Sequence, residues 1–335
     1  MLKFVMAILV RDQPMLSANG IHRIHCRIWQ PEPSAGRPRA LLQIIHGKGE
    51  HVGRYGRFAE DMVRQGFIVF GEDHLGHGHS VANAGEFGDT GPGDASFHII
   101  RDIHHLRGEM ETAWPELPLF ILGHSMGSFL LRRYLMEHGE GLAGAIIMGT
   151  GEPDRLALAG GSLLLQLMRL VHSDHYDSPL MDRLTTGNYN RRIERPRTSS
   201  DWLSRDPAEV DAFRSDPLTG HRFRLNAYDM LFTTLRFIQR PANIERIPKH
   251  LPLLLVAGSE DPVGDYTTGV RRVWESYRTA GLRSMTLKFY PEARHELLNE
   301  YCRDEVIDDI LRWCDGQPLA NSETTLDLPR GTRRA

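Results

Sequence analysis

The sequence predicts an α/β fold in which a mostly parallel central sheet is covered by helices on both faces. The first observation is a series of compact, mainly apolar runs of strand length, with helical stretches between most of them. Such strands are typical of a sheet buried between two helical layers. The predicted strands are residues 41–45, 67–70, 119–122, 145–148, 253–256 and 285–289. In the stretch 55–65, Phe58, Met62 and Val63 mark one face of a helix.

A hairpin precedes these strands. Asn19-Gly20 is a strong hairpin turn signal. From Ile24 to Ile28 an apolar side chain occupies every second position, as in a half-buried strand. Residues 1–10, a short apolar run with one lysine, supply the first predicted strand.

The second observation is that the alternation of strands and helices breaks between residues 151 and 245. This segment is too long for a crossover and has helical patterns of its own, including an almost entirely apolar helix at residues 163–171. We therefore predict a helical cap at 151–245, inserted into a core domain made of residues 1–150 and 246–315. Residues 316–335 are predicted to be a flexible C-terminal tail.

Composition excludes several classes of protein. The 335 residues include 40 Lys+Arg and 43 Asp+Glu, and the net charge of −3 gives no electrostatic reason to expect a nucleic acid partner. No uncharged apolar run approaches the ~20 residues of a membrane span.

The sequence contains part of a zinc-binding motif. His295-Glu296 begins an H-E-x-x-H-like sequence, but position 299 is Asn, so the second zinc ligand is missing. We expect neither a metal nor an organic cofactor.

We expect the protein to be cytoplasmic. The apolar run at residues 1–10 is followed at once by Arg11 and Asp12, and no small-x-small cleavage site of a signal peptide lies nearby. Of the three cysteines, Cys302 and Cys314 are predicted to share one helix about 18 Å apart, which is too far for a disulfide. Free thiols are typical of a reducing compartment.

The strongest local signal for chemistry is Gly123-His124-Ser125-Met126-Gly127. It follows a predicted strand and precedes a helical stretch, which resembles the nucleophile elbow of the α/β-hydrolases. In such an elbow the serine sits on a strained backbone, and glycines flank it because side chains there would clash. A plain strand-to-helix turn is the alternative. We predict that Ser125 is a nucleophile.

A serine nucleophile needs a base and a group that orients the base. In the α/β-hydrolase fold the chain order is serine, acid, histidine. Asp261, at the turn after the strand 253–256, is the candidate acid, and the neighbouring Glu260 is its competitor. His295 follows the last predicted strand and is the only histidine after Asp261. We predict that Ser125, Asp261 and His295 form a catalytic triad.

An oxyanion hole should accompany the triad, since acyl transfer builds negative charge on a carbonyl oxygen. One donor is expected to be the backbone N–H of Met126, which follows the nucleophile. The strand 41–45 leads into His46-Gly47-Lys48-Gly49-Glu50-His51, whose glycines allow the backbone to approach a substrate closely. We assign the second donor to the backbone N–H of Lys48.

Taken together, these motifs resemble the monoacylglycerol lipase and lysophospholipase group of α/β-hydrolases, often filed with serine aminopeptidase-like hydrolases. The likeness covers roughly residues 15–315. The segments that carry it are 46–51 (H-G-x-G-E-H), 73–80 (D-x-x-G-H-G-x-S), the elbow at Ser125, 261–264, 294–300 and the cap segment 202–220.

The Lys48 side chain and the segment 73–80 each have two possible roles. Lys48 stands where the family usually has a small or apolar residue, and its ammonium is expected to point to solvent, with contact to a substrate phosphate as the alternative. Residues 73–80 are expected to form a turn that braces the oxyanion loop rather than a catalytic element, an ordinary glycine-rich turn being the alternative.

The resemblance implies a serine hydrolase that cleaves the ester of a monoacylglycerol or a lysophospholipid through an acyl-enzyme. A general carboxylesterase or a proline iminopeptidase-like aminopeptidase on the same triad is the alternative. The peptidase would need cap carboxylates for a free amino terminus, and Glu209, Asp211 and Asp216 are present. A non-catalytic receptor on a hydrolase scaffold is the alternative from another class. The cap is also a candidate for peripheral membrane contact, and the oligomeric state stays open.

Overall fold

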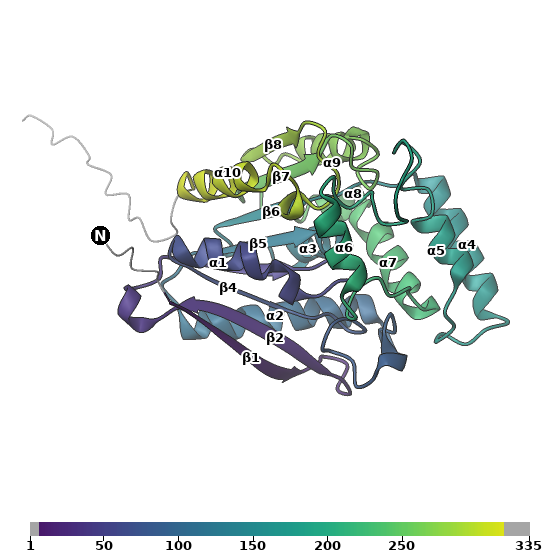
Figure 1. Ribbon diagram of the computed structural model, residues 1–335, viewed down its shortest axis with the longest axis horizontal. Coiled ribbons are helices and arrows are strands. Elements are labelled where there is room, and N and C mark those ends of the chain that lie inside the picture. Colours follow the sequence, from purple (N-terminus) through teal and green to yellow (C-terminus); the bar gives the residue numbers. More distant parts are fainter. Residues whose placement is uncertain (1–6, 318–335) are drawn as a thin grey trace, which may run out of the picture.

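A computed structural model describes residues 7–317 of the chain. One sheet of eight strands organises the molecule, in the order β1-β2-β4-β3-β5-β6-β7-β8 (Figure 1). The strands are β1 Ile8–Leu16, β2 Arg23–Pro31, β3 Ala40–Ile45, β4 Phe67–Glu72, β5 Leu119–His124, β6 Gly144–Met148, β7 Leu253–Gly258 and β8 Met285–Tyr290. Pairs β1–β2 and β2–β4 are antiparallel, and all the others are parallel. The predicted fold class is confirmed.

Helices cover both faces of the sheet. The helices are α1 Gly56–Arg64, α2 Ala95–Ala113, α3 Met126–His138, α4 Arg155–Arg169, α5 Pro179–Thr185, α6 Pro207–Ser215, α7 Leu225–Ile238, α8 Pro241–Ile244, α9 Thr268–Thr279 and α10 Arg303–Asp315. Buried apolar side chains of α2, α3, α7 and α9 form a core with one face, and those of α1 and α10 form a core with the other. The strands between them are continuously buried because both of their faces are covered.

The N-terminal hairpin differs in its bounds from the prediction. The strand predicted at residues 1–10 runs instead from Ile8 to Leu16, and residues 1–6 lie outside the described part of the chain. Asp12 does not end the strand, because it lies opposite Arg27 on β2 and accepts a hydrogen bond of 2.6 Å from its Nε. Opposite charges on facing strands stabilise an exposed edge pair. The turn at Gly20, which has φ of 71°, is as predicted.

The segment between the neighbouring strands β6 and β7 holds five helices, α4 to α8. In Figure 1, α4 and α5 lie together at one end of the sheet. α7 packs on α2, α3 and α4 and so attaches the segment to the sheet domain. The predicted tail at 316–335 lies outside the described residues, apart from Gly316 and Gln317. Within residues 7–317, no helix combines the length and the apolar character needed to cross a membrane.

Candidate active site

Ser125 sits at a sharp turn between β5 and α3. Its φ of 55° and ψ of −123° define a backbone conformation that residues other than glycine rarely adopt. The flanking glycines have a steric reason: a Cβ on Gly123 would lie 2.4 Å from the carbonyl oxygen of Gly127, and a Cβ on Gly127 would lie 2.0 Å from that of Ile45. The backbone N–H of Ser125 donates to Met148 O on β6 at 3.0 Å, which fixes the turn against the sheet.

Asp261 and His295 follow the neighbouring strands β7 and β8, and they meet. Nδ1 of His295 lies 2.9 Å from both carboxylate oxygens of Asp261, and both side chains are buried. The carboxylate also accepts a hydrogen bond of 2.9 Å from the backbone N–H of Val263. Nε2 of His295 is buried and has no hydrogen-bond partner among residues 7–317.

Glycine at position 149 allows the imidazole to come close to the elbow. Gly149 follows Met148, which holds the Ser125 backbone, and has φ of 59°. A Cβ here would lie 3.1 Å from Cε1 of His295, so a larger residue would push the ring away. The sequence analysis did not single out this residue, although a glycine directly after a buried strand was a usable signal.

The loop after β3 lies directly against the nucleophile. A Cβ on Gly47 would be 2.9 Å from Cβ of Ser125. The N–H of Gly47 itself donates to Oε1 of Glu50 at 2.6 Å. Within the described residues, no acceptor is assigned to the backbone N–H of Lys48 or of Met126. Lys48 and Met126 both line the cavity described below, which makes these two N–H groups the candidates for binding a substrate oxygen.

The Lys48 side chain is where the sequence-based expectation is wrong. It does not point to solvent: its exposed fraction is 17%, and Nζ donates to Oδ1 of Asp182 on α5 at 2.8 Å. Nζ also lies 3.4 Å from the hydroxyl of Tyr228. Burial lowers the pKa of Lys48, and the Asp182 carboxylate opposes that shift. The aromatic and acidic partners come from the inserted segment, which local sequence does not reveal.

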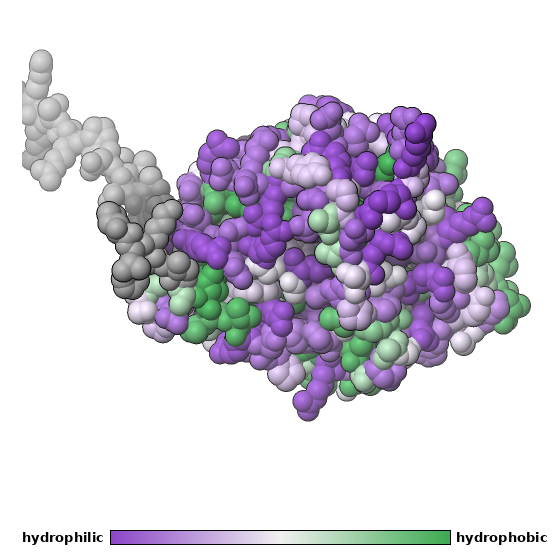
Figure 2. All heavy atoms as spheres, in the orientation of Figure 1, coloured by the Kyte–Doolittle hydropathy of each residue, from purple (hydrophilic) through white to green (hydrophobic). Residues whose placement is uncertain are grey.

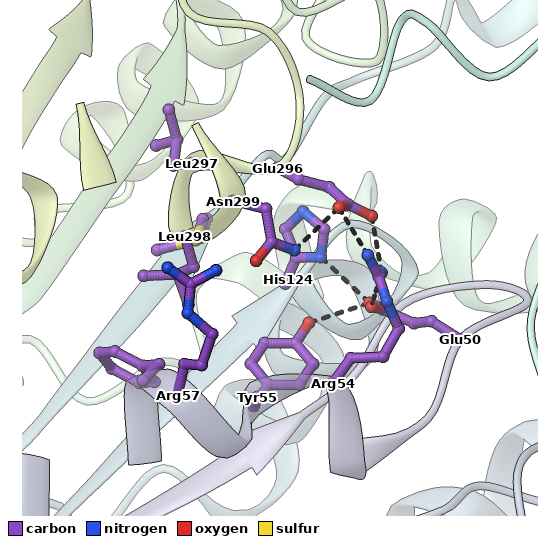
Figure 3. Close-up of a pocket in the computed structure, with 11 residues that line it drawn as sticks. Glu50, Arg54, Tyr55, Arg57, His124, Glu296, Leu297, Leu298 and Asn299 are labelled. Atoms are coloured by element: carbon purple, nitrogen blue, oxygen red, sulfur yellow. Dashed lines mark hydrogen bonds and ion pairs between the residues drawn. The ribbon is translucent and has the colours of Figure 1, made fainter. Parts of the chain in front are cut away.

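A buried polar network joins three segments: the proposed oxyanion loop that begins at residue 46, the elbow at Ser125, and the histidine loop, residues 291–296 (Figure 3). Oε1 of Glu50 accepts a hydrogen bond from the Tyr55 hydroxyl at 2.9 Å and lies 3.1 Å from Nδ1 of His124. The Arg54 guanidinium donates to Glu50 at 2.8 Å and to both oxygens of Glu296, at 2.7 and 2.8 Å. Three loops are thus tied together by five side chains.

The ionisable groups of this network shift one another's pKa. Burial opposes ionisation of Glu50, but His124 and Arg54 hold its pKa well below its usual value. Burial likewise disfavours the charged form of His124, but Glu50 raises its pKa overall. The sequence analysis quoted Glu50 and Glu296 in motifs without giving them a role. The spacing of Glu50 and Arg54, four residues apart, was the only local signal.

Residues 73–80 brace the oxyanion loop, as predicted. Oδ1 of Asp73 accepts a hydrogen bond from the backbone N–H of Val52 at 2.7 Å, and Oδ2 accepts one from that of His79 at 2.9 Å. The backbone N–H of His74 donates to Nε2 of His46 at 3.0 Å, and the two rings stack with centroids 4.0 Å apart. Through these contacts the turn fixes both ends of the loop that carries Lys48.

A cavity of about 340 Å³ opens above the serine. Ser125, Met126 and Lys48 from the core share its lining with Asp182 and Trp202 from the inserted segment. The Trp202 ring also packs on His295, with centroids 5.0 Å apart. Substrate in this cavity would therefore contact both the proposed catalytic residues and the inserted helices.

Other histidines have structural partners. His104 lies 2.9 Å from the hydroxyl of Tyr134 and stacks on His138, with centroids 4.0 Å apart. His172 stacks on Tyr176. In the part of the chain that the structure describes, no three histidine, cysteine or acidic side chains gather as metal ligands would.

Comparison with known proteins assigns this chain to a family. The serine aminopeptidase, S33 family matches residues 36–301. The monoglyceride lipase of Rattus norvegicus is 30% identical over 309 residues, which cover 90% of this chain and 90% of that protein. The monoacylglycerol lipase of Mycolicibacterium smegmatis is 28% identical over 311 residues, covering 90% of this chain and 96% of that protein.

A solved structure gives the same result. The crystal structure of a highly thermostable carboxyl esterase from Bacillus coagulans, in complex with glycerol, has a TM-score of 0.84 and 32% identity, covering 92% of this chain and 98% of that one. The protein is thus an α/β-hydrolase of the ester-cleaving kind, with a serine hydrolase domain. The chain belongs to the serine aminopeptidase, S33 family and falls in its monoacylglycerol lipase-like group.

Proposed function

We propose that the protein hydrolyses the carboxylic ester of a lipid with one acyl chain, a monoacylglycerol or a lysophospholipid, through an acyl-enzyme on Ser125. The observation that carries the proposal is the His295 ring. Its Nδ1 is held by Asp261, and its Nε2 is buried and unpartnered within residues 7–317, on a ring that packs beside the elbow. Similarity to monoglyceride lipases over most of the chain supports the lipid substrate.

In the proposed mechanism, Nε2 of His295 takes the proton of the Ser125 hydroxyl as its oxygen attacks the ester carbonyl. The backbone N–H groups of Lys48 and Met126 hold the resulting oxyanion. Asp261 keeps the proton of the neutral imidazole on Nδ1 and stabilises the charged ring that forms. The ring then gives the proton to the leaving alcohol, and water releases the acyl group by the same route.

A substrate panel tests the proposal. We expect at least one of the two lipid classes, monoacylglycerol or lysophosphatidylcholine, to be cleaved with kcat/KM at least about tenfold above that for short-chain esters, since each buried methylene contributes ~0.8 kcal/mol. Fatty acid release is measured by titration at constant pH. Equal or faster cleavage of acetyl and butyryl esters would instead favour a general carboxylesterase, an alternative that similarity to the Bacillus coagulans enzyme supports.

The aminopeptidase alternative lacks a free carboxylate among the three residues considered for it. Glu209 pairs with Arg57. Asp211 pairs with Arg197 at 2.7 Å, and Asp216 lies 2.9 Å from Nε2 of His51. A substrate ammonium would have to displace an arginine or histidine side chain from each of them. In the same panel, cleavage of a proline p-nitroanilide faster than of p-nitrophenyl esters would overturn the lipid proposal.

The protein is also proposed to contact membranes through an apolar cap face on α4, the turn after it and α5. The face is exposed in Figure 2 at the end of the molecule where these helices lie. It comprises Leu156, Leu163, Leu167, Leu170, Val171, Leu180 and Leu184. Asp182 and Thr185 on the same helix α5 line the cavity, so a bilayer bound there would lie beside the entry for a lipid.

Replacing Leu163 and Leu167 together by serine is expected to lower binding to lipid vesicles by at least about tenfold, because these side chains are 62% and 53% exposed and would insert into the bilayer. Co-sedimentation with vesicles of phosphatidylcholine and phosphatidylglycerol measures the binding. Leu16 and Ile21, exposed apolar residues of the N-terminal hairpin, give the matched serine control. Equal loss in both double variants would contradict a specific face.

The three cysteines carry free thiols, which is compatible with the expected cytoplasmic location.

A further inference from the structure

The ion pair between Lys48 and Asp182 lies in the wall of the cavity that contains Ser125. Lys48 belongs to the proposed oxyanion loop and Asp182 to α5 of the inserted segment, and both line the cavity. The Asp182 side chain is 31% exposed, so it is accessible from the cavity. The proposed mechanism uses the backbone N–H of Lys48 but gives no role to the side chain of Lys48 or of Asp182.

The Lys48 ammonium and the Asp182 carboxylate cancel each other's charge, so this part of the cavity wall carries no net charge. Nζ of Lys48 lies 2.8 Å from Oδ1 of Asp182, and it also lies over the rings of Phe223 and Tyr228, 5.0 and 5.2 Å from their centroids. The Tyr228 hydroxyl donates to the same carboxylate oxygen at 3.3 Å. The ammonium is therefore already compensated by a carboxylate and two ring faces. A substrate phosphate at Lys48 would meet the Asp182 carboxylate as well, and like charges repel strongly where water is excluded.

The pair still offers hydrogen bonds to an uncharged group. Nζ has three N–H donors, of which two are directed to Asp182 and the Tyr228 hydroxyl. Among residues 7–317, no hydrogen bond is assigned to Oδ2 of Asp182. The neighbouring hydroxyls of Thr185 and Thr186 donate back to the α5 backbone. One donor and one strong acceptor thus remain side by side, an arrangement that suits hydroxyl groups, which both donate and accept.

We propose that the Lys48–Asp182 pair is the specificity determinant for the alcohol part of the substrate, selecting an uncharged, hydroxyl-bearing group and rejecting an anionic one. This inference rests on the proposed ester hydrolysis and narrows its substrate to monoacylglycerol rather than an anionic lysophospholipid. The residues act through the charge and hydrogen bonds of the cavity wall and take no part in proton transfer.

The test compares kcat/KM for a monoacylglycerol and for its 3-phosphate ester with the same acyl chain, both below their critical micelle concentrations. The wild-type chain is expected to prefer the uncharged ester. The preference is the ratio of kcat/KM for the uncharged ester to kcat/KM for the phosphate ester. Asp182→Asn leaves the Lys48 cation uncompensated, so this ratio should fall at least about tenfold. Lys48→Met leaves the Asp182 anion uncompensated, so the preference should rise. Asp174→Asn, which alters the half-buried pair with Arg169 in the same segment, away from the cavity lining, should leave the ratio unchanged.

Opposite shifts in the two variants are a result that a purely structural role of the pair would not give, since loss of packing lowers both activities together. Suppose that thermal unfolding shows Asp182→Asn to be folded and that its ratio of kcat/KM values for the two esters is unchanged. This result would overturn the proposal and leave ester hydrolysis standing. If Asp182→Asn does not fold, Lys48→Met decides by the direction of its shift. If the wild-type chain cleaves neither ester, the proposed function itself is wrong, and this proposal falls with it.

Discussion

Replacing Ser125 by alanine is expected to lower kcat for ester hydrolysis by about 10⁴- to 10⁶-fold, because the attacking oxygen is removed while the fold is kept. Among residues 7–317 the Ser125 side chain makes no hydrogen bond, and those at the elbow are made by its backbone, through its N–H to the carbonyl of Met148 and its carbonyl to Ser128. Initial rates with a p-nitrophenyl ester and a monoacylglycerol measure the loss.

The matched control for this variant is Ser276→Ala on α9, which removes a hydroxyl that donates to the carbonyl of Val273 in its own helix. Its rate should stay within about twofold of wild type. Thermal unfolding of both variants checks that they are folded. If folded Ser125→Ala keeps more than a hundredth of the wild-type rate, Ser125 is not the nucleophile.

Replacing Asp261 by asparagine is expected to lower kcat by about 10⁴-fold, because an amide cannot hold the neutral imidazole in the tautomer with its proton on Nδ1 or stabilise the charged ring. Both carboxylate oxygens lie 2.9 Å from Nδ1 of His295, so the substitution acts on that contact directly.

Glu260→Gln is the control for this second variant, since Glu260 is the neighbouring acid and is exposed. Its own backbone N–H donates to Ala293, which the substitution leaves in place. We expect a rate within about threefold of wild type. A larger loss in Glu260→Gln than in Asp261→Asn would mean that the acid is assigned to the wrong residue.

The fold could be predicted from the sequence because its signals are local. Most of the parallel strands are short, mainly apolar runs bounded by turns, because burial on both faces of the sheet favours apolar side chains. The elbow was predictable for the same reason, since strand, glycine, serine and glycine are adjacent in the chain. The first strand was misplaced because its stability depends on the cross-strand contact of Asp12 with Arg27, fifteen residues away.

Side-chain directions at the site were not predictable in this way. Lys48 is charged and lies in a loop, so solvent is its default environment, yet its partner Asp182 is 134 residues further along the chain. Arg54, which binds Glu50 four residues away, binds Glu296 across 242 residues. Neither contact leaves a pattern in local sequence, because each depends on where the inserted segment and the last loop fold back over the sheet.

The central claim is that Ser125 is the residue that becomes covalently acylated, and labelling with a fluorophosphonate tests it most directly. The wild-type chain is treated with the reagent, digested, and the modified peptide is mapped by mass spectrometry. We expect one adduct, on Ser125, with activity lost in proportion to labelling and no adduct in Ser125→Ala. An adduct on a different serine, or full activity in a chain labelled at Ser125, would contradict the mechanism.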